Sequence, residues 1–183
     1  MPVTTSDSTY SIELAQPRHL PRLPSVELAA ARLLVGHAPE SVLAMATSAR
    51  DFERAWRDGH LWVALADDHP VGFAHVKLLE PRVAHLEELD VHPDHGRRGV
   101  GRRLVEAVCE WARHEDLESV TLSTFRDVPW NRPFYERLGF VVVPVESLTP
   151  ALARLVETER ERGLDTARRV VMRRVLSASK IAG

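Results

Sequence analysis

The stretch from Leu86 to Ala112 constrains the fold of this chain more than any other segment. It begins as a strand pattern, "LEELDV", continues through the glycine-containing loop "HPDHGRRGVG", and ends in a run whose apolar residues recur at helical spacing. Those apolar residues are Val100, Leu104, Val108 and either Trp111 or Ala112. A strand that passes through a short turn into an amphipathic helix predicts a mixed α/β protein.

Within that strand the alternation of apolar residues slips by one position. Apolar residues fall at 86, 89 and 91, where a regular strand would keep them two apart. Such a slip predicts a β-bulge, and bulges are frequent beside active sites. A bulged strand exposes N–H and C=O groups that are free to pair with an extended, amide-containing ligand.

The other segments predict one domain over residues 1–183 in which strands and helices interleave after an antiparallel start. A hairpin is expected over 60–80, with its turn at Asp67–Pro70. Further strands are predicted over 10–17, 83–93, 117–125, 140–146 and 167–176. Helices are predicted over 24–36, 47–59, 99–114, 129–139 and 150–162, with Thr47 or Ser48 as one N-cap.

Composition limits the function classes. The chain is 44% hydrophobic and 27% charged, with a formal net charge of -2, so the arginines of the loop are a local feature and not part of a nucleic-acid-binding excess. Its one cysteine, Cys109, excludes an internal disulfide framework. The first residues lack a signal-peptide pattern, and no apolar run is long enough to cross a bilayer. We therefore expect a cytoplasmic protein without membrane or nucleic-acid partners.

The glycine loop fails two well-known phosphate motifs. A Walker loop ends in Gly-Lys-Ser/Thr, whereas this one ends in Gly-Arg-Arg, and a dinucleotide fingerprint needs glycine where Leu104 stands. The loop still lies before a helix N-terminus, where backbone amides attract anions. On the loop alone, the alternative is a helix capped by Gly99 with solvated arginines.

The segments "LDVHPDHGRRGVGRRLVEAV" and "WNRPFYERLGFVVV" together resemble the GCN5-related N-acetyltransferase (GNAT) superfamily, most clearly over residues 71–143. The resemblance implies an α/β (α+β) fold with a mostly antiparallel central sheet of about six to seven strands, a bulge in the fourth strand, and helices on both faces. Family members usually carry Gln or Arg, two variable residues, then Gly-x-Gly or Gly-x-Ala. Gly99 and Gly101 match, but Gly96 holds the leading position, so we interpret the loop as a shifted variant.

The resemblance also implies acetyl-coenzyme A as the acetyl donor. Its pantetheine arm would pair with the backbone of Leu89, Asp90 and Val91. Asn131 would form a hydrogen bond to the cofactor. Exposed arginines would meet its 3′-phosphate. The pyrophosphate would lie on the backbone amides of Arg97, Arg98, Gly99, Val100, Gly101 and Arg102.

The resemblance places Tyr135 at the sulfur. Acetyl transfer from a thioester to an amine needs two proton transfers, because the amine loses a proton and the departing thiolate gains one. A tyrosine, with an ordinary pKa of about 10, is protonated near neutral pH and suits the role of acid. The alternative is a core aromatic beside Phe134.

The base is expected on the bulged strand. Several family members carry Glu or His at positions matching His85 and Glu87, which share one strand face, and either residue would act directly or through water. Glu88 and Asp90 share the other face up to the point where the bulge shifts the register. The alternative is that Glu87 and Glu88 are solvated strand residues.

Several other features receive simpler interpretations. His92 and His95 have a ligand-like spacing but lie in a turn without further candidate ligands, so no metal site is expected. Cys109 lies on the apolar side of its helix and is interpreted as a packing thiol. Four arginines, interpreted as the exposed ends of the last strand, are Arg168, Arg169, Arg173 and Arg174.

The resemblance therefore predicts an N-acetyltransferase that moves an acetyl group from acetyl-coenzyme A to a primary amine by direct transfer in a ternary complex. The acceptor is a small-molecule or peptide amine, and the acidic residues of the bulged strand hint that it is cationic. The alternative is a module that binds coenzyme A or an acyl-coenzyme A as a sensor without turnover. Family members often form dimers, so a homodimer is an open prediction.

Overall fold

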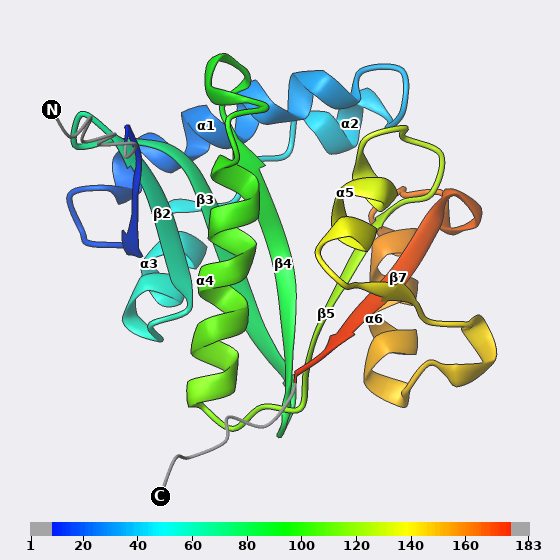
Figure 1. Cartoon of the computed structure of the whole chain (residues 1–183). Coiled ribbons are helices and arrows are strands. Elements are labelled where there is room, and N and C mark those ends of the chain that lie inside the picture. Colours follow the sequence, from blue (N-terminus) through cyan, green and yellow to red (C-terminus); the bar gives the residue numbers. More distant parts are fainter. Residues whose placement is uncertain (1–8, 177–183) are drawn as a thin grey trace, which may run out of the picture.

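A seven-stranded sheet forms the centre of the computed structural model, which describes residues 9–176 (Figure 1). The strands lie in the order β1, β2, β3, β4, β5, β7, β6, and β4 and β5 form the parallel pair in an otherwise antiparallel sheet. The strand bounds are β1 Ser11–Leu14, β2 Leu61–Ala66, β3 His69–Glu80, β4 Val83–Val91, β5 Ser119–Phe125, β6 Val141–Val142 and β7 Arg169–Val175.

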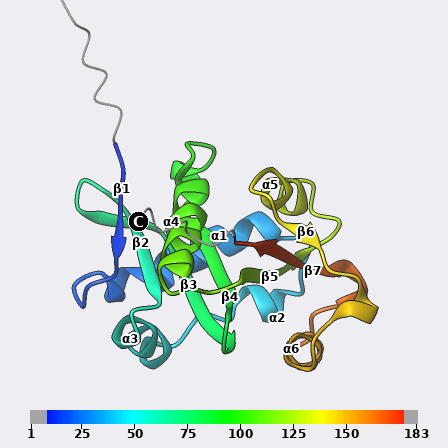
Figure 2. The same cartoon turned by 60° about the horizontal axis from the view of Figure 1, so that its bottom comes forward.

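Helices cover both faces of this sheet. Figure 2 shows α4 and α5 above it and α3 and α6 below. The short helix α2 belongs to the connection between α1 and α3. The helix bounds are α1 Leu23–Ala31, α2 Glu40–Leu43, α3 Ala49–Arg57, α4 Val100–His114, α5 Asn131–Arg137 and α6 Pro150–Glu161. The expected fold class is confirmed.

The two layers explain why β2 is buried along its whole length. Trp62 and Ala64 pack into the core beneath α4, whereas Val63 and Leu65 pack into the core beneath α1 and α3. Because each face of the strand meets a helix layer, the apolar run "LWVALA" shows no alternation with polar residues. Each such large side chain stabilises the fold by about 1.5–3 kcal/mol when fully buried.

The predicted bulge lies in β4. His75 of β3 is the partner of Glu88, and the next residue, Val76, is the partner of Leu86, so Glu87 is the extra residue of the longer strand. The slip of the apolar pattern between positions 86 and 89 therefore marks the bulge correctly.

The parallel pair β4 and β5 separates at the same point. Their register runs from Val83 opposite Ser119 to Leu86 opposite Leu122 and stops there. Beyond Leu86 the two strands are no longer paired, and Figure 1 shows their ribbons diverging; we call this interruption of the backbone pairing the opening. The sheet is thus interrupted where the bulge redirects β4.

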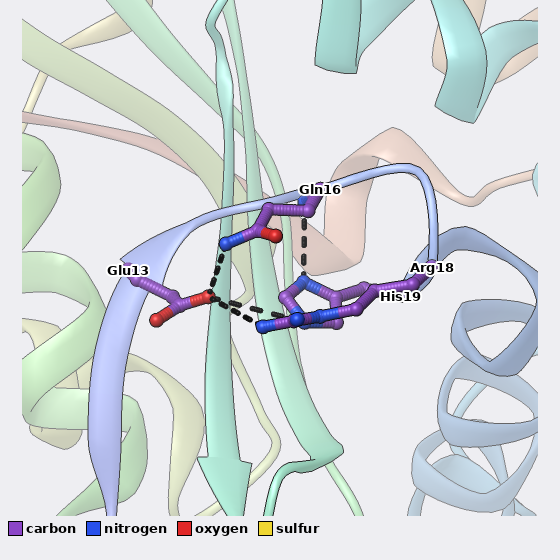
Figure 3. A network of polar contacts seen from close by, with 4 residues as sticks. All are labelled: Glu13, Gln16, Arg18 and His19. Atoms are coloured by element: carbon purple, nitrogen blue, oxygen red, sulfur yellow. Dashed lines mark hydrogen bonds and ion pairs between the residues drawn. The ribbon is translucent and has the colours of Figure 1, made fainter.

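A polar network ties the end of β1 to the start of the α1 region (Figure 3). The Gln16 backbone N–H donates to His19 Nδ1 at 3.1 Å, and the other ring nitrogen of His19 faces Glu13 Oε1 at 3.9 Å. Gln16 Nε2 also donates to Glu13 Oε1 at 3.1 Å, and Arg18 lies 4.0 Å from the same oxygen. Burial lowers the pKa of His19, so the neutral ring serves as a structural link.

Most predicted elements are present, with Ser48 as the N-cap of α3 through its bond from the Asp51 N–H. The strand expected over 140–146 is wrong in length, because β6 holds two residues and Pro144, which has no N–H, follows it closely. Within residues 9–176, no helix has both the length and the apolar character to cross a membrane. The signal-peptide prediction concerns residues 1–14, of which residues 1–8 lie outside the described part of the chain.

Candidate active site

The loop before α4 brings backbone amides to one side of the opening. Arg97 and Gly99 have left-handed backbones, with φ of 58° and 78°. The first helical bond of α4 runs from the Arg103 N–H to the Gly99 C=O at 3.0 Å, so the amides before Arg103 have no partner in the helix. Such amides at the N-terminus of a helix attract an anion.

Gly96 explains how this loop departs from the usual pattern. Its N–H bonds to the Pro93 C=O at 3.0 Å and closes a tight turn. A Cβ at Gly96 would lie 3.0 Å from that carbonyl oxygen, so the turn leaves little space for the longer side chain of the family pattern.

Three of the loop arginines already have protein partners. Arg98 Nη1 donates to the Tyr10 hydroxyl at 3.4 Å, and Arg103 Nη1 donates to the Tyr10 C=O at 2.8 Å. Arg102 pairs with Glu106 one turn along α4 at 3.0 Å. The Tyr10 hydroxyl also lies 3.0 Å from His95 Nδ1. The N-terminal strand region therefore braces the loop from 85 residues away in the sequence.

The end of β4, the start of α4 and α5 converge at the opening. A Cβ at Gly101 would lie 3.5 Å from Phe134 Cζ on α5 and 3.7 Å from Val91 Cγ2 on β4. Asn131 and Tyr135 lie on α5 at positions i and i+4, which places both on one side of that helix. Among the described residues, no backbone hydrogen bond joins the 87–91 segment of β4 to β5.

Tyr135 stands in an aromatic cluster beside this opening. Its ring centroid lies 5.0 Å from that of Phe134 and 5.8 Å from that of Phe140. Burial, followed by the nearby Asp90 carboxylate, raises the pKa of the Tyr135 phenol, so the hydroxyl stays protonated. No hydrogen bond occupies this hydroxyl within residues 9–176.

The face of the sheet opposite α4 carries a cavity of about 1230 Å³. Its walls come from the α1–α3 region on one side and from α6 on the other. We call it the acceptor-side cavity. Its floor comes from β3 and β4, whose titratable side chains there are His75, Lys77, His85, Glu87 and Glu88.

The two predicted bases lie on this floor, and each has a partner. His85 is buried, and its Nδ1 lies 3.0 Å from the Thr121 hydroxyl. Lys77 Nζ donates to Glu87 Oε1 at 2.8 Å. Burial acts to raise the pKa of Glu87, but this bond together with the charges of Lys77, His85 and His75 lowers it below its usual value. Burial lowers the pKa of His85 to about 4.

The bulge brings Glu88 to the same floor, where it meets residues that the sequence analysis missed. The Thr47 hydroxyl is 3.0 Å from Glu88 Oε2 and 3.0 Å from Glu27 Oε1, and the Thr47 N–H donates to both Glu27 oxygens at 2.9 Å. Burial and the carboxylates of Asp90 and Glu27 raise the pKa of Glu88 to about 9. Glu27 is 6% exposed on the buried face of α1, and a charged residue on that apolar face was the overlooked signal.

These shifts predict how stability depends on pH. Burial and Glu27 raise the pKa of Asp90 to about 8, so from the ordinary carboxyl pKa of about 4 up to these folded-state values the folded chain holds protons on Glu88 and Asp90 that the unfolded chain has lost. The free energy of unfolding should therefore fall as pH rises through this range. The slope should not exceed ~1.4 kcal/mol per pH unit for each of these protons, because that is the contribution of one proton held by the folded chain and lost by the unfolded chain.

Thermal unfolding of Glu88→Gln in a pH series checks this prediction. The variant should show a flatter decline than the wild type, while Glu110→Gln, on the exposed side of α4, should keep the wild-type decline. An unchanged slope in Glu88→Gln would contradict the proton uptake at Glu88.

The structure agrees with the interpretation of Cys109 but not with that of Arg169. Cys109 is buried in the main core, where burial raises the pKa of its thiol, in agreement with a packing role. The interpretation of the arginines as exposed strand ends is wrong for Arg169, which begins β7 but pairs with Glu159 at 2.6 Å and covers the Phe125 ring at 4.7 Å, with its side chain 12% exposed. In the described residues, no group of three or more His, Cys, Asp or Glu side chains is arranged to hold a metal.

The separation of β4 from β5 and the glycine loop before α4 are typical of an acetyltransferase fold. Residues 31–140 match the model of the acetyltransferase (GNAT) family, and the chain belongs to this family. The family resemblance seen in the sequence is thus confirmed.

Relatives and solved structures agree with this assignment. A 74-residue segment is 32% identical to "Uncharacterized N-acetyltransferase ycf52" of Gracilaria tenuistipitata var. liui, and the match covers 40% of this chain and 39% of that relative. The PaiA N-acetyltransferase of Thermoplasma acidophilum, solved with coenzyme A, has a TM-score of 0.72 at 16% identity, over 91% of this chain and 98% of that one. The ribosomal-protein-S18-alanine N-acetyltransferase of Escherichia coli has a TM-score of 0.64 at 17% identity, over 95% and 98%. At these identities the solved structures share the fold.

Proposed function

We propose that this protein transfers an acetyl group from acetyl-coenzyme A directly to a primary amine in a ternary complex. The observation that carries the proposal is the opening between β4 and β5, where an amide-rich loop and the Tyr135 hydroxyl lie on one side and the acceptor-side cavity lies on the other. Membership of the GNAT family supports the reaction class, and the coenzyme A bound to the Thermoplasma structure supports the donor.

The residues at the opening fit acetyl-coenzyme A, which supplies the activated acetyl thioester. The 87–91 segment of β4 has a backbone edge without bonds to β5, which suits the amides of a pantetheine arm at Leu89, Asp90 and Val91. The amides of the loop suit a pyrophosphate, and Asn131 on α5 is the proposed side-chain donor to the cofactor. The loop amides proposed to bind the pyrophosphate are those of Arg97, Arg98, Gly99, Val100, Gly101 and Arg102.

The proposed acid is Tyr135. As the amine nitrogen forms its bond to the acetyl carbon, the carbon–sulfur bond breaks and the thiolate takes the phenol proton. Its raised pKa keeps the phenol protonated until the thiolate develops. His85 and Glu87 remain the bases that the sequence predicts. In the structure, Nδ1 of His85 is bonded to the Thr121 hydroxyl, and Glu87 accepts a hydrogen bond from Lys77.

The proposed acceptor is a cationic amine. Glu27 and Glu88 share Thr47 at the edge of the cavity floor, and Glu88 holds a proton that a bound ammonium group would displace. An exchange of a carboxyl proton for an ammonium ion keeps the local charge balanced, which favours a positively charged acceptor over a neutral one.

Thiol release from acetyl-coenzyme A, measured with a panel of primary amines and with calorimetric binding of coenzyme A, tests the proposal. Small diamines, amino acids and peptide N-termini form the panel. We expect binding of coenzyme A and thiol release that depends on an amine. Binding without release for every amine would favour the alternative of a coenzyme A sensor, and absence of binding would refute the proposed site.

A further inference from the structure

His75 on β3 is a buried titratable residue that the proposed function leaves unused. It is 7% exposed, lines the acceptor-side cavity, and stands directly opposite Glu88 at the bulge. Within residues 9–176, no hydrogen bond or ion pair occupies its ring nitrogens. Among the described side chains, the one fully enclosed polar atom without a hydrogen bond is Arg173 Nε, so the unbonded ring nitrogens of His75 keep access to the cavity and can meet a group that enters it.

The neighbouring floor residues are already engaged. His85 bonds to Thr121, and Glu87 pairs with Lys77. Glu88 shares Thr47 with Glu27 and holds its proton near neutral pH. Among these described candidates for a base, His75 is the one whose ring has no hydrogen bond at either nitrogen, whereas Thr121 holds the His85 ring through Nδ1 and leaves only its Nε2 unbonded.

We propose that His75 accepts the proton that the acceptor nitrogen loses when it is acetylated. This inference rests on the proposed function. In the step, the nitrogen lone pair forms the carbon–nitrogen bond, the carbon–sulfur bond breaks, the nitrogen proton moves to the His75 imidazole, and the thiolate takes the Tyr135 proton. Solvent in the cavity then removes the proton from the imidazolium, and the phenolate regains one from solvent.

The surroundings of His75 suit this cycle. Burial is the largest cause that lowers its pKa, to about 4, so the ring is neutral and ready to accept a proton at neutral pH. After the transfer, the same burial drives the proton off again. The titratable groups that face His75 from the surrounding elements are Lys77, Glu87, His60, Asp51 and, directly opposite on β4, Glu88.

The test uses the full chain with acetyl-coenzyme A and an amine that the wild type acetylates. We expect kcat of His75→Ala to fall by about 10²-fold or more, the usual contribution of a positioned base. Added imidazole should restore a large part of that loss, because it can occupy the space left beside the cavity. The KM for acetyl-coenzyme A should stay near the wild-type value, because the loop before α4 lies on the other face of the sheet.

Three further variants make the result decisive. His75→Gln, of similar size, should lose activity equally without rescue, and its circular dichroism shows whether it is folded. His60→Ala removes another cavity histidine, which packs against Trp111, and should keep its activity and show no imidazole effect. A folded His75→Gln with wild-type kcat, or imidazole rescue in His85→Ala instead of His75→Ala, would overturn the inference. Absence of transfer by the wild type with every amine would instead refute the proposed function, and this inference with it.

Discussion

Tyr135→Phe is expected to lower kcat by about 10²-fold or more while leaving the affinity for coenzyme A nearly unchanged. The substitution removes the hydroxyl and keeps the ring in its contacts with Phe134 and Phe140. Because the hydroxyl has no hydrogen bond to the described residues, its loss leaves no buried group unpaired. The effect should therefore fall on the proton transfer and not on stability.

Steady-state thiol release at saturating acetyl-coenzyme A and amine gives kcat, and calorimetry gives the coenzyme A affinity. The matched control is Tyr10→Phe, because the chain has two tyrosines. Tyr10 braces Arg98 and His95 at the loop, so its variant should raise the KM for acetyl-coenzyme A and keep kcat. If Tyr135→Phe retains wild-type kcat, Tyr135 is not the acid.

Gly72→Ala should have the largest effect on stability. Gly72 lies on β3 opposite Val91, and a Cβ there would lie 2.8 Å from the Asp90 backbone oxygen and 3.4 Å from Leu104 Cδ1. Because the nearest atom belongs to the backbone, β4 must move to relieve the contact. We expect a loss of about 1–3 kcal/mol in the free energy of unfolding, the usual cost of overpacking.

The same movement displaces the β4 segment that we propose to pair with the pantetheine arm. The KM for acetyl-coenzyme A should rise by roughly tenfold for each ~1.4 kcal/mol of binding free energy that is lost. Denaturant unfolding and steady-state kinetics measure the two effects. The control for stability is Gly101→Ala, whose Cβ would make an ordinary contact with Phe134 at 3.5 Å. Wild-type stability in Gly72→Ala would show that β4 does not lie this close to Gly72.

Local patterns predicted much of the fold for identifiable reasons. The hairpin turn is read from Asp67 and Asp68, both of which adopt left-handed backbones in the structure. Gly99 predicts the start of α4, and the slip in the apolar alternation before Leu89 predicts the bulge. In each case the signal and the structure that it specifies lie within a few residues of each other.

These local patterns predicted the residue types of the candidate site but not their partners. Sequence reasoning placed Glu87 and His85 among candidate bases but did not reveal that Lys77 and Thr121 occupy them. Arg169 was misinterpreted because a charged residue in a strand is normally at the surface, whereas the ion pair with Glu159 leaves this side chain 12% exposed.

The sequence by itself determined the family, the order of strands and helices, the bulge, and the loop whose amides suit an anion, because these depend on neighbouring residues and backbone preferences. Only the tertiary structure decided which side chains meet. It brings Glu27 and Thr47 from the α1–α3 region to Glu88 on β4, places Tyr10 against the loop, and leaves the ring of His75 open to the cavity. These contacts depend on the packing of helices against a sheet, which brings together residues far apart in the chain. No local sequence pattern can therefore predict them.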